Sequence, residues 1–146
     1  MAEQTTSSIV VQAAPHAVMD VIADFPAYPA WVKGMKVAEP HGASPAGGRA
    51  ERVRFVLDVP PIKDDYTLAY TWDGDHKVSW HLVEGNLLRT LDGAYTLRDQ
   101  GDGSTEVTYQ LVLDLSIPLI GMLKRKGEKM LIETALRGLK TRVESL

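Results

Sequence analysis

Apolar and polar residues alternate through the middle of the chain. From Lys33 to Leu115, successive segments place an apolar side chain at every second position, which is the period of a β-strand with one buried face. Turn sequences such as Asp73-Gly74-Asp75 and Gly85-Asn86 separate the segments, as in antiparallel hairpins. The predicted strands are Met35 to Glu39, Arg49 to Val59, Lys63 to Trp72, Lys77 to Glu84, Leu88 to Arg98 and Ser104 to Leu115.

The N-terminal part has a different pattern. A short β-branched segment, Ser7 to Gln12, predicts a first strand, and a helical period follows from Ala14 to about Asp24. The next segment, Phe25 to Trp31, contains two prolines three residues apart. Two prolines at this spacing do not fit the interior of a regular helix, so we expect a broken turn that carries Tyr28 and Trp31.

The last thirty residues, Ile117 to Leu146, predict one long helix with two apolar faces. Pro118 suits a first helical turn, and Ser116 can cap it. We expect the face formed by Ile132, Leu136, Leu139, Val143 and Leu146 to pack as ordinary core. The other face carries Leu123, Gly127 and Met130. Gly127 and Met130 stand where bulky core side chains would be expected, so we expect this face to border a space that is not fully filled. Simple core packing of this face is the alternative.

A sheet with one apolar face must bury that face, and the terminal helix is the longest element available to cover it. The sequence therefore predicts an α+β fold: a curved antiparallel sheet of six to seven strands wraps around the C-terminal helix, and two short helices follow the first strand. A chain of 146 residues can bury an adequate core by itself, so we expect one domain over residues 1–146.

Composition narrows the function classes. The chain has no cysteine, which excludes disulfides, thiolate metal sites and a cysteine nucleophile. Its polar N-terminus lacks the apolar region of a secretion signal, and the apolar run Leu111 to Leu123 is too short to cross a bilayer. We therefore expect a cytoplasmic protein without a transmembrane segment. The terminal helix holds seven Lys and Arg against three Glu, whereas the remaining chain holds nine against sixteen acidic residues. That acidic body argues against nucleic-acid binding.

Candidate catalytic residues are few. His16, His41, His76 and His81 are scattered without metal-ligand spacing, and no catalytic or phosphate-binding motif is present, so we predict neither a metal nor a cofactor. Glu84 and Arg89, which flank the Gly85-Asn86 turn, are the ionisable residues that we expect to point inward near the sheet centre. They could act on a ligand carbonyl, but strand ends usually lie at the solvent, so a salt bridge at the rim is the preferred interpretation.

Several short motifs occur in a familiar order and spacing. They are Ala14-Pro15 after the first strand, Tyr28-Pro29-x-Trp31, Val78-Ser79-Trp80, Asp92-Gly93-Ala94-Tyr95, and Asp102-Gly103 leading to Thr108-Tyr109. Through these motifs the sequence resembles the helix-grip superfamily, which includes START lipid-transfer domains, the birch-pollen-allergen fold, polyketide cyclase/dehydrase proteins and coenzyme-Q-binding proteins. The actinobacterial cyclase/dehydrase-like group is the most similar.

The resemblance implies an apolar cavity between sheet and helix, which relatives use for lipids, sterols, quinones or polyketides. The inward positions of the strands agree, because they carry many aromatic residues with phenol groups that could orient a ligand. The predicted ligand-binding residues are Phe55, Tyr66, Tyr70, Trp72, Trp80, Leu82, Tyr95, Tyr109 and Leu111 from the sheet, and Leu123, Gly127 and Met130 from the helix. The alternative is that the same side chains fill the core solidly.

Three functions remain open from the sequence. The preferred one is non-catalytic binding or carrying of a hydrophobic small molecule, such as a lipid, quinone or polyketide-like compound. The second is a polyketide cyclase, aromatase or dehydratase, in which Tyr66, Tyr70, Tyr95, Arg89 and Glu84 would position the substrate and move protons. The third is an interaction module whose basic helix face, Lys124-Arg125-Lys126 with Lys129, contacts an anionic membrane or an acidic protein.

Overall fold

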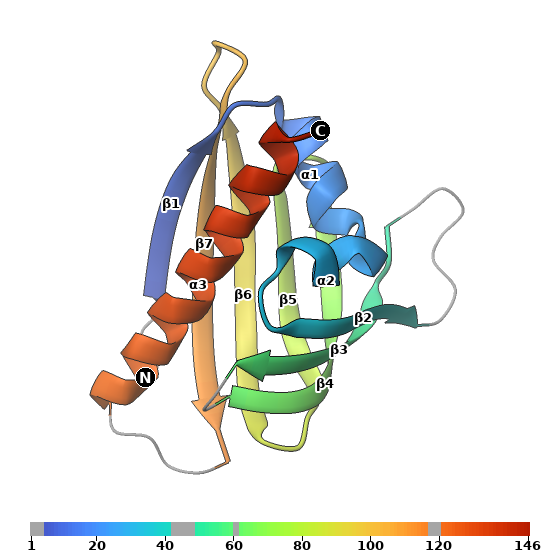
Figure 1. Cartoon of the computed structure of the whole chain (residues 1–146), viewed down its shortest axis with the longest axis vertical. Helices are drawn as coiled ribbons and strands as arrows, with labels where there is room; N and C mark the ends of the chain where they lie inside the picture. The colour runs from blue at the N-terminus through green and yellow to red at the C-terminus, as the bar shows by residue number, and fades with distance from the viewer. Residues whose placement is uncertain (1–4, 42–48, 60–61, 117–120) are drawn as a thin grey trace.

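A single antiparallel sheet of seven strands forms the body of the protein (Figure 1). The computed structural model describes residues 5–41, 49–59, 62–116 and 121–146, and for residues 62 and 121–123 the backbone alone. The strands are β1 (Thr5–Val11), β2 (Met35–His41), β3 (Arg52–Val59), β4 (Ile62–Asp73), β5 (Lys77–Glu84), β6 (Leu88–Asp99) and β7 (Thr105–Leu115). Their order in the sheet is β1-β7-β6-β5-β4-β3-β2, so each strand from β2 to β7 lies beside its neighbour in sequence, and β1 joins at the far edge.

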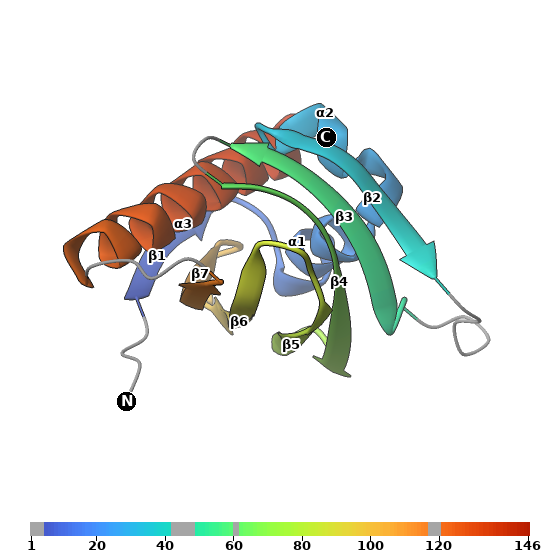
Figure 2. The same ribbon diagram turned by 90° about the horizontal axis from the view of Figure 1, so that it is seen from below.

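The helices lie on the concave side of this sheet (Figure 2). They are α1 (Pro15–Ala23), the 3₁₀ turn η1 (Phe25–Ala27), α2 (Tyr28–Trp31) and α3 (Gly121–Glu144). Pro15 occupies the first turn of α1, where the missing N–H costs nothing. The α3 helix packs chiefly on β1 and β7 and also touches α1 and α2. The predicted helix-grip fold is confirmed, although residues 117–120, including Pro118, lie outside the described part.

One face of α3 forms a solid core with the sheet and α1. Ile132, Leu136, Leu139 and Val143 are all buried, as predicted for this face. The expected continuation to Leu146 is wrong, because α3 ends at Glu144 and the Leu146 side chain is 79% exposed. No helix in the described part of the chain is long and apolar enough to span a bilayer.

A buried carboxylate fastens α3 to the sheet. Glu128 lies four residues before Ile132, on the same face of the helix, and is fully buried. Its carboxylate accepts a hydrogen bond of 2.6 Å from the Thr5 hydroxyl in β1 and another of 2.7 Å from the Leu113 backbone N–H in β7. A buried carboxylate needs such donors, so this arrangement sets the position of α3 along the β1 and β7 edge.

Candidate functional site

Two small chambers lie between the concave face of the sheet and α3. The first, which we name the aromatic chamber, has a volume of about 80 Å³ and is lined by Tyr28, Val32, Met35, Phe55, Tyr66, Leu68, Tyr70, Trp80, Leu91, Tyr95, Tyr109 and Ala135. The second, the mouth chamber, has a volume of about 70 Å³ and is lined by Val32, Lys33, Met35, Leu57, Val59, Tyr66, Leu91, Tyr109, Leu131, Thr134 and Ala135. Because many residues line both, the chambers are neighbouring parts of one space.

Aromatic side chains build the wall of the aromatic chamber on the sheet side. Alternation along β3, β4, β5, β6 and β7 points one ring after another to the concave face. The Tyr95 and Tyr109 rings meet edge to face with centroids 4.5 Å apart, and Trp80 lies 5.5 Å from Tyr109 and 5.7 Å from Tyr70. Phe55 continues the series with Tyr66, stacked at 5.5 Å. Rigid rings in such contacts pack firmly against one another but leave gaps that flexible aliphatic chains would fill.

The phenol groups of this wall are free to bind a ligand. The hydroxyls of Tyr66, Tyr70, Tyr95 and Tyr109 form no hydrogen bond with another described residue, in contrast to Tyr28, whose hydroxyl donates to the Ile22 carbonyl. Burial raises the pKa of all four phenols above the ordinary tyrosine value, and Tyr109 raises the pKa of the other three further. They therefore stay protonated at neutral pH and can donate to a carbonyl or hydroxyl oxygen of a ligand.

The segment that follows α2 closes the space opposite α3. Val32 and Met35 point into both chambers, and Gly34 between them adopts a left-handed conformation with φ of +87°. A side chain on Gly34 would overlap Val59, and the Gly34 carbonyl accepts a hydrogen bond of 2.8 Å from the Asp58 N–H. Glycine is required here because the turn must approach the end of β3 closely. The turn therefore holds Val32, Lys33 and Met35 in place at the mouth.

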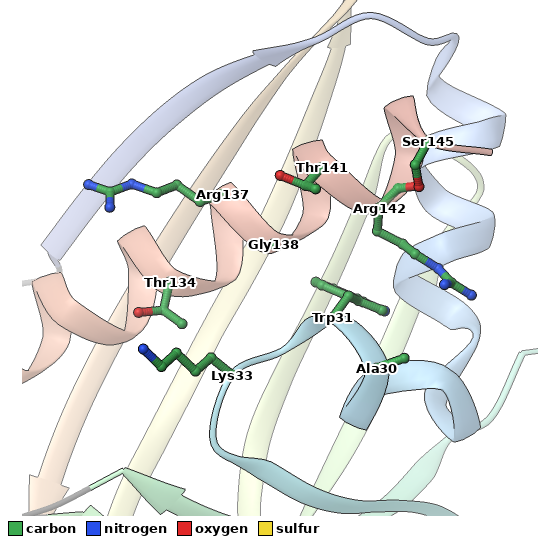
Figure 3. A pocket seen from close by; sticks show the side chains of 9 residues that line it. All are labelled: Ala30, Trp31, Lys33, Thr134, Arg137, Gly138, Thr141, Arg142 and Ser145. Atoms are coloured by element: carbon green, nitrogen blue, oxygen red, sulfur yellow. The ribbon is translucent and has the colours of Figure 1, made fainter.

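An open groove adjoins the mouth chamber on the outside, between α2 and the second half of α3 (Figure 3). It has a volume of about 530 Å³ and is lined by Ala30, Trp31, Lys33, Thr134, Arg137, Gly138, Thr141, Arg142 and Ser145. Lys33 and Thr134 line both the groove and the mouth chamber. At the floor of the groove, a side chain on Gly138 would overlap the carbonyl oxygen of Trp31, so glycine permits α2 to lie directly against α3.

Six of the predicted ligand-binding residues come together around the aromatic chamber, namely Phe55, Tyr66, Tyr70, Trp80, Tyr95 and Tyr109. Trp72, Leu82 and Leu111 line neither chamber. The Trp72 indole N–H instead donates to the Ala50 carbonyl at 2.8 Å, and the Arg49 guanidinium lies 5.4 Å from the centroid of a Trp72 ring. Leu111 is fully buried among core side chains.

The helix residues of the site differ from those expected. Gly127 and Met130 line neither chamber, and the side chain of Leu123 lies outside the described part. The α3 wall is instead formed by Leu131, Thr134 and Ala135. The predicted ligand-binding residues did not include these three, although Thr134 lies on the same line of the helix as Leu123 and Met130, and Leu131 lies beside that line. Val32, Met35 and Leu91 were also missing from the predicted site. Of these, Leu91 could have been included, because it shares the inward parity of Tyr95.

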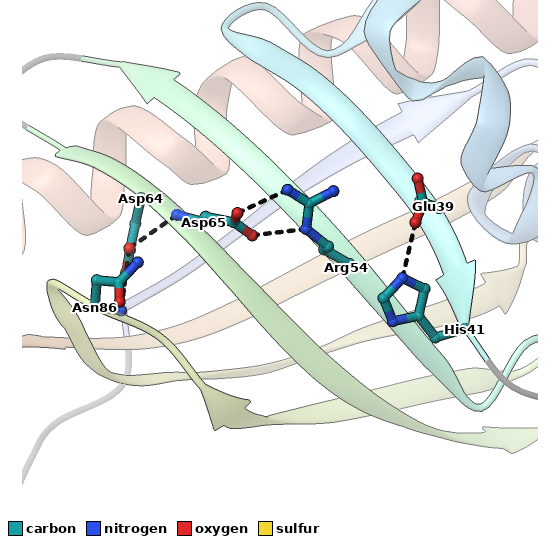
Figure 4. Close-up of polar contacts among 6 residues, drawn as sticks. All are labelled: Glu39, His41, Arg54, Asp64, Asp65 and Asn86. Carbon is teal, nitrogen blue, oxygen red and sulfur yellow. Dashed lines mark hydrogen bonds and ion pairs between the residues drawn. The ribbon is translucent and has the colours of Figure 1, made fainter.

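Glu84 and Arg89 lie at the solvent, as the preferred interpretation expected, and they form neither an inward pair nor the expected salt bridge. Both side chains are exposed, and no ion pair joins them. The buried carboxylate of this region is Asp64, which accepts hydrogen bonds from the backbone N–H groups of Asn86, Leu87 and Leu88 at 2.9 to 3.1 Å. Figure 4 shows Asp64 beside Asn86. Asp64 has the same strand parity as Tyr66, which was the signal for its burial. Because the turn after β5 consumes its acceptor capacity, Asp64 is a structural residue.

Polar contacts outside the chambers are ordinary surface pairs. Arg54 binds Asp65 through two hydrogen bonds of 2.7 and 2.9 Å, which hold the pKa of Asp65 below its usual value, and His41 contacts Glu39 at 2.8 Å (Figure 4). Among the described residues, no three His, Asp or Glu side chains lie together in a geometry for a metal ion. No His, Asp or Glu occurs among the described residues that line the two chambers.

The family whose model matches this chain is described as polyketide cyclase/dehydrase and lipid transport, and the match spans residues 2–144. The chain belongs to this family. The predicted resemblance is thereby confirmed. No curated protein matches the sequence.

Solved structures show the same fold at low sequence identity. A START superfamily protein from Mycobacterium smegmatis has a TM-score of 0.89 at 20% identity, with 97% of each chain covered. A protein from Thermus thermophilus has a TM-score of 0.80 at 24% identity, with 98% of each chain covered. The Zhui aromatase/cyclase from Streptomyces sp. R1128 has a TM-score of 0.77 at 15% identity, with 99% of this chain and 94% of that chain covered. The family includes cyclases, dehydrases and lipid-transport proteins, so membership does not select one chemistry.

Proposed function

We propose that this member of the polyketide cyclase/dehydrase and lipid transport family binds or carries a hydrophobic small molecule between the sheet and α3. The observation that carries the proposal is the set of four tyrosines, Tyr66, Tyr70, Tyr95 and Tyr109, that line the aromatic chamber and whose hydroxyls make no hydrogen bond with another described residue. A phenol hydroxyl in a largely apolar space can donate a hydrogen bond to a ligand, so a ligand with one or two polar groups would be stabilised there. Lipids, quinones and polyketide-like compounds all have this character.

The volume of the chambers limits the ligand. Each chamber is well below the roughly 300 to 1,000 Å³ of a typical small-molecule pocket. Binding therefore displaces side chains at the mouth, where Met35 and Leu131 are half-buried. Methionine and leucine side chains at a rim can change rotamer at small cost, and methionine is the more adaptable.

Catalysis is the less well supported alternative. A cyclase, aromatase or dehydratase needs a group that removes a proton, and none of the described chamber residues is a histidine or a carboxylic acid. The raised pKa of the tyrosines makes them hydrogen-bond donors and poor bases at neutral pH. Glu84 and Arg89 are exposed and do not line the chambers. What remains is polarisation of a ligand carbonyl, which a carrier also provides.

Filling the chambers tests the proposal. Ala135 lines both, so Ala135→Leu should weaken binding of the neutral apolar dye N-phenyl-1-naphthylamine about tenfold or more, because the added side chain occupies the ligand space. Lys129→Leu, on the exposed side of the same helix, is the matched control and should bind like the parent. Circular dichroism must show that both variants are folded.

Two outcomes would refute the ligand cavity. One is a folded Ala135→Leu protein that binds the dye as tightly as the parent, and the other is a parent protein that binds neither the dye nor a slender apolar probe such as decan-1-ol. Native mass spectrometry of the purified protein would then identify any co-purifying compound. Assays of the parent with polyketide-like substrates decide between carrier and cyclase, since product formation would support the catalytic alternative.

The basic face of α3 is a separate possibility for surface contact. Arg125, Lys126 and Lys129 are exposed, as solvated helix residues usually are. Transient contact with an anionic membrane remains a prediction that co-sedimentation with anionic vesicles would test. Cytoplasmic localisation is likewise retained as a prediction.

A further inference from the structure

The groove outside the mouth chamber is positively charged on a protein that is negative as a whole. The chain has a formal net charge of −3, yet three cationic residues, Lys33, Arg137 and Arg142, line this groove. None of its described lining residues is acidic. Such a local excess of positive charge attracts an anionic group.

Two of these cations lack a carboxylate partner among the described residues. Lys33 and Arg142 form no ion pair with another described residue, whereas Arg137 lies 3.9 Å from Glu133. Figure 3 shows Lys33 and Thr134 facing each other across the gap between the α2 side and α3, while Arg137 points away along the outside of the helix. Lys33 is therefore the cation that is best placed at the entrance.

The entrance joins the charged groove to the apolar space. Lys33 and Thr134 line the groove and also the mouth chamber, whose other walls are largely apolar and include Val32, Met35 and Leu131. The Gly34 turn is fastened to β3, so the backbone that carries Lys33 is held at this boundary. A ligand that crosses the boundary meets a cation and a hydroxyl on one side and apolar side chains on the other.

The volumes also favour a ligand divided between the two spaces. The chambers, at about 70 and 80 Å³, admit only a slender apolar part, whereas the groove, at about 530 Å³, has room for a larger head. We propose that the ligand is a single-chain amphiphile whose anionic head, a carboxylate or phosphate ester, lies at Lys33 in the groove and whose apolar tail enters the chambers. This inference rests on the proposed function and specifies its ligand class.

A pair of probes with equal chains tests the inference. Decanoate and decan-1-ol share a ten-carbon chain and differ in the charge of the head. By isothermal titration calorimetry at low salt, the parent should bind decanoate about three- to tenfold more tightly than decanol. The advantage should shrink as salt rises, because exposed charges are screened, while the affinity for decanol should stay nearly constant.

Charge-removing variants locate the effect. Lys33→Gln should weaken decanoate binding about three- to fivefold and leave decanol binding unchanged, and adding Arg142→Gln should extend the loss to about tenfold. Lys36→Gln is the matched control: it removes the same charge three residues away, and Lys36 is exposed and does not line the groove or the chambers. It should bind both probes like the parent.

The outcomes separate this inference from the proposed function. Equal binding of decanoate and decanol, or equal losses in the Lys33 and Lys36 variants, would overturn the anionic head and leave the apolar cavity standing. Failure of both probes and of the neutral dye would overturn the proposed function as well. Lys33-dependent sedimentation with phosphatidylglycerol vesicles, without decanoate binding, would overturn the amphiphile in favour of a membrane-surface contact.

Discussion

The two sides of α3 differ in how they meet the rest of the protein. On one side, which we call the solid side, Ile132, Leu136, Leu139 and Val143 are at most 6% exposed and belong to the continuous core that includes α1. On the other, the hollow side, Leu131, Thr134 and Ala135 face aromatic rings and leave two chambers. The same helix therefore supports both a filled and an unfilled space. Branched aliphatic side chains fill the first, whereas rigid rings and small helix residues leave the second open.

The polar groups of the two sides differ in the same way. On the solid side, the buried carboxylate of Glu128 accepts hydrogen bonds from Thr5 and Leu113, so the fold uses its capacity. On the hollow side, the hydroxyls of Tyr66, Tyr70, Tyr95 and Tyr109 form no hydrogen bond with another described residue. Polar groups on the solid side thus serve stability, and those on the hollow side are available to a ligand.

Alkaline pH should produce the largest effect, because it acts on the hollow side through several tyrosines at once. Burial raises the pKa of all five tyrosines, Tyr28, Tyr66, Tyr70, Tyr95 and Tyr109. Above about pH 10 the unfolded chain releases these protons and the folded protein keeps them, so the free energy of unfolding should fall by about 1.4 kcal/mol for each tyrosine and pH unit. Below that pH, the tyrosines should leave stability unchanged.

Urea unfolding between about pH 8 and 11, followed together with tyrosinate absorbance, measures this effect. Tyrosinate should appear together with unfolding. Gradual ionisation near pH 10 in a protein that stays folded would show that the phenols of the hollow side are open to water.

Leucine truncation on α3 compares the two sides directly. Leu139→Ala should lower the free energy of unfolding by about 2 to 5 kcal/mol, since Leu139 is fully buried on the solid side. Leu131→Ala should cost clearly less, because Leu131 is half-buried and already borders a chamber. Chemical denaturation of both variants gives the difference. Equal losses would mean that the hollow side is packed as tightly as the solid side.

The fold was predictable from periodicity. Alternation predicted the strands from β2 to β7, including Lys77 to Glu84 with both ends correct, and β-branched residues predicted β1. The helical stripe predicted the buried face from Ile132 to Val143. These patterns arise because one face of each element is buried. Apolar residues therefore recur at every second position in a strand and at every third to fourth position in a helix. The solid side was therefore visible in the sequence.

The site was predictable only in part. Strand parity identified the aromatic wall, but whether rings fill or line a space depends on the opposite wall. That wall consists of Ala135, Thr134 and the turn at Gly34, which have no apolar periodicity. The buried carboxylates were missed even though a signal existed: Glu128 continues the stripe of Ile132 backwards by one turn, and Asp64 has the parity of Tyr66. Burial of a charge depends on donors from distant segments, and a local pattern does not show them.

The smallest expected effect comes from removing single hydroxyl groups, and it separates polar groups that serve the fold from those that do not. Tyr28→Phe should cost about 0.5 to 1.5 kcal/mol, because the Tyr28 hydroxyl donates to the Ile22 carbonyl in the last turn of α1, where backbone carbonyls lack helical partners. Tyr109→Phe should change the free energy of unfolding by less than about 0.5 kcal/mol, since its hydroxyl has no described protein partner to lose.

Both variants remove one oxygen from a tyrosine that lines the aromatic chamber, so each controls for the other. Urea denaturation at neutral pH measures them under identical conditions. A loss for Tyr109→Phe as large as that for Tyr28→Phe would show that the Tyr109 hydroxyl already stabilises the ligand-free fold. If Tyr109→Phe is neutral for stability but weakens binding of decan-1-ol, whose hydroxyl can accept a hydrogen bond from the phenol, the phenol acts on the ligand, as expected for the hollow side.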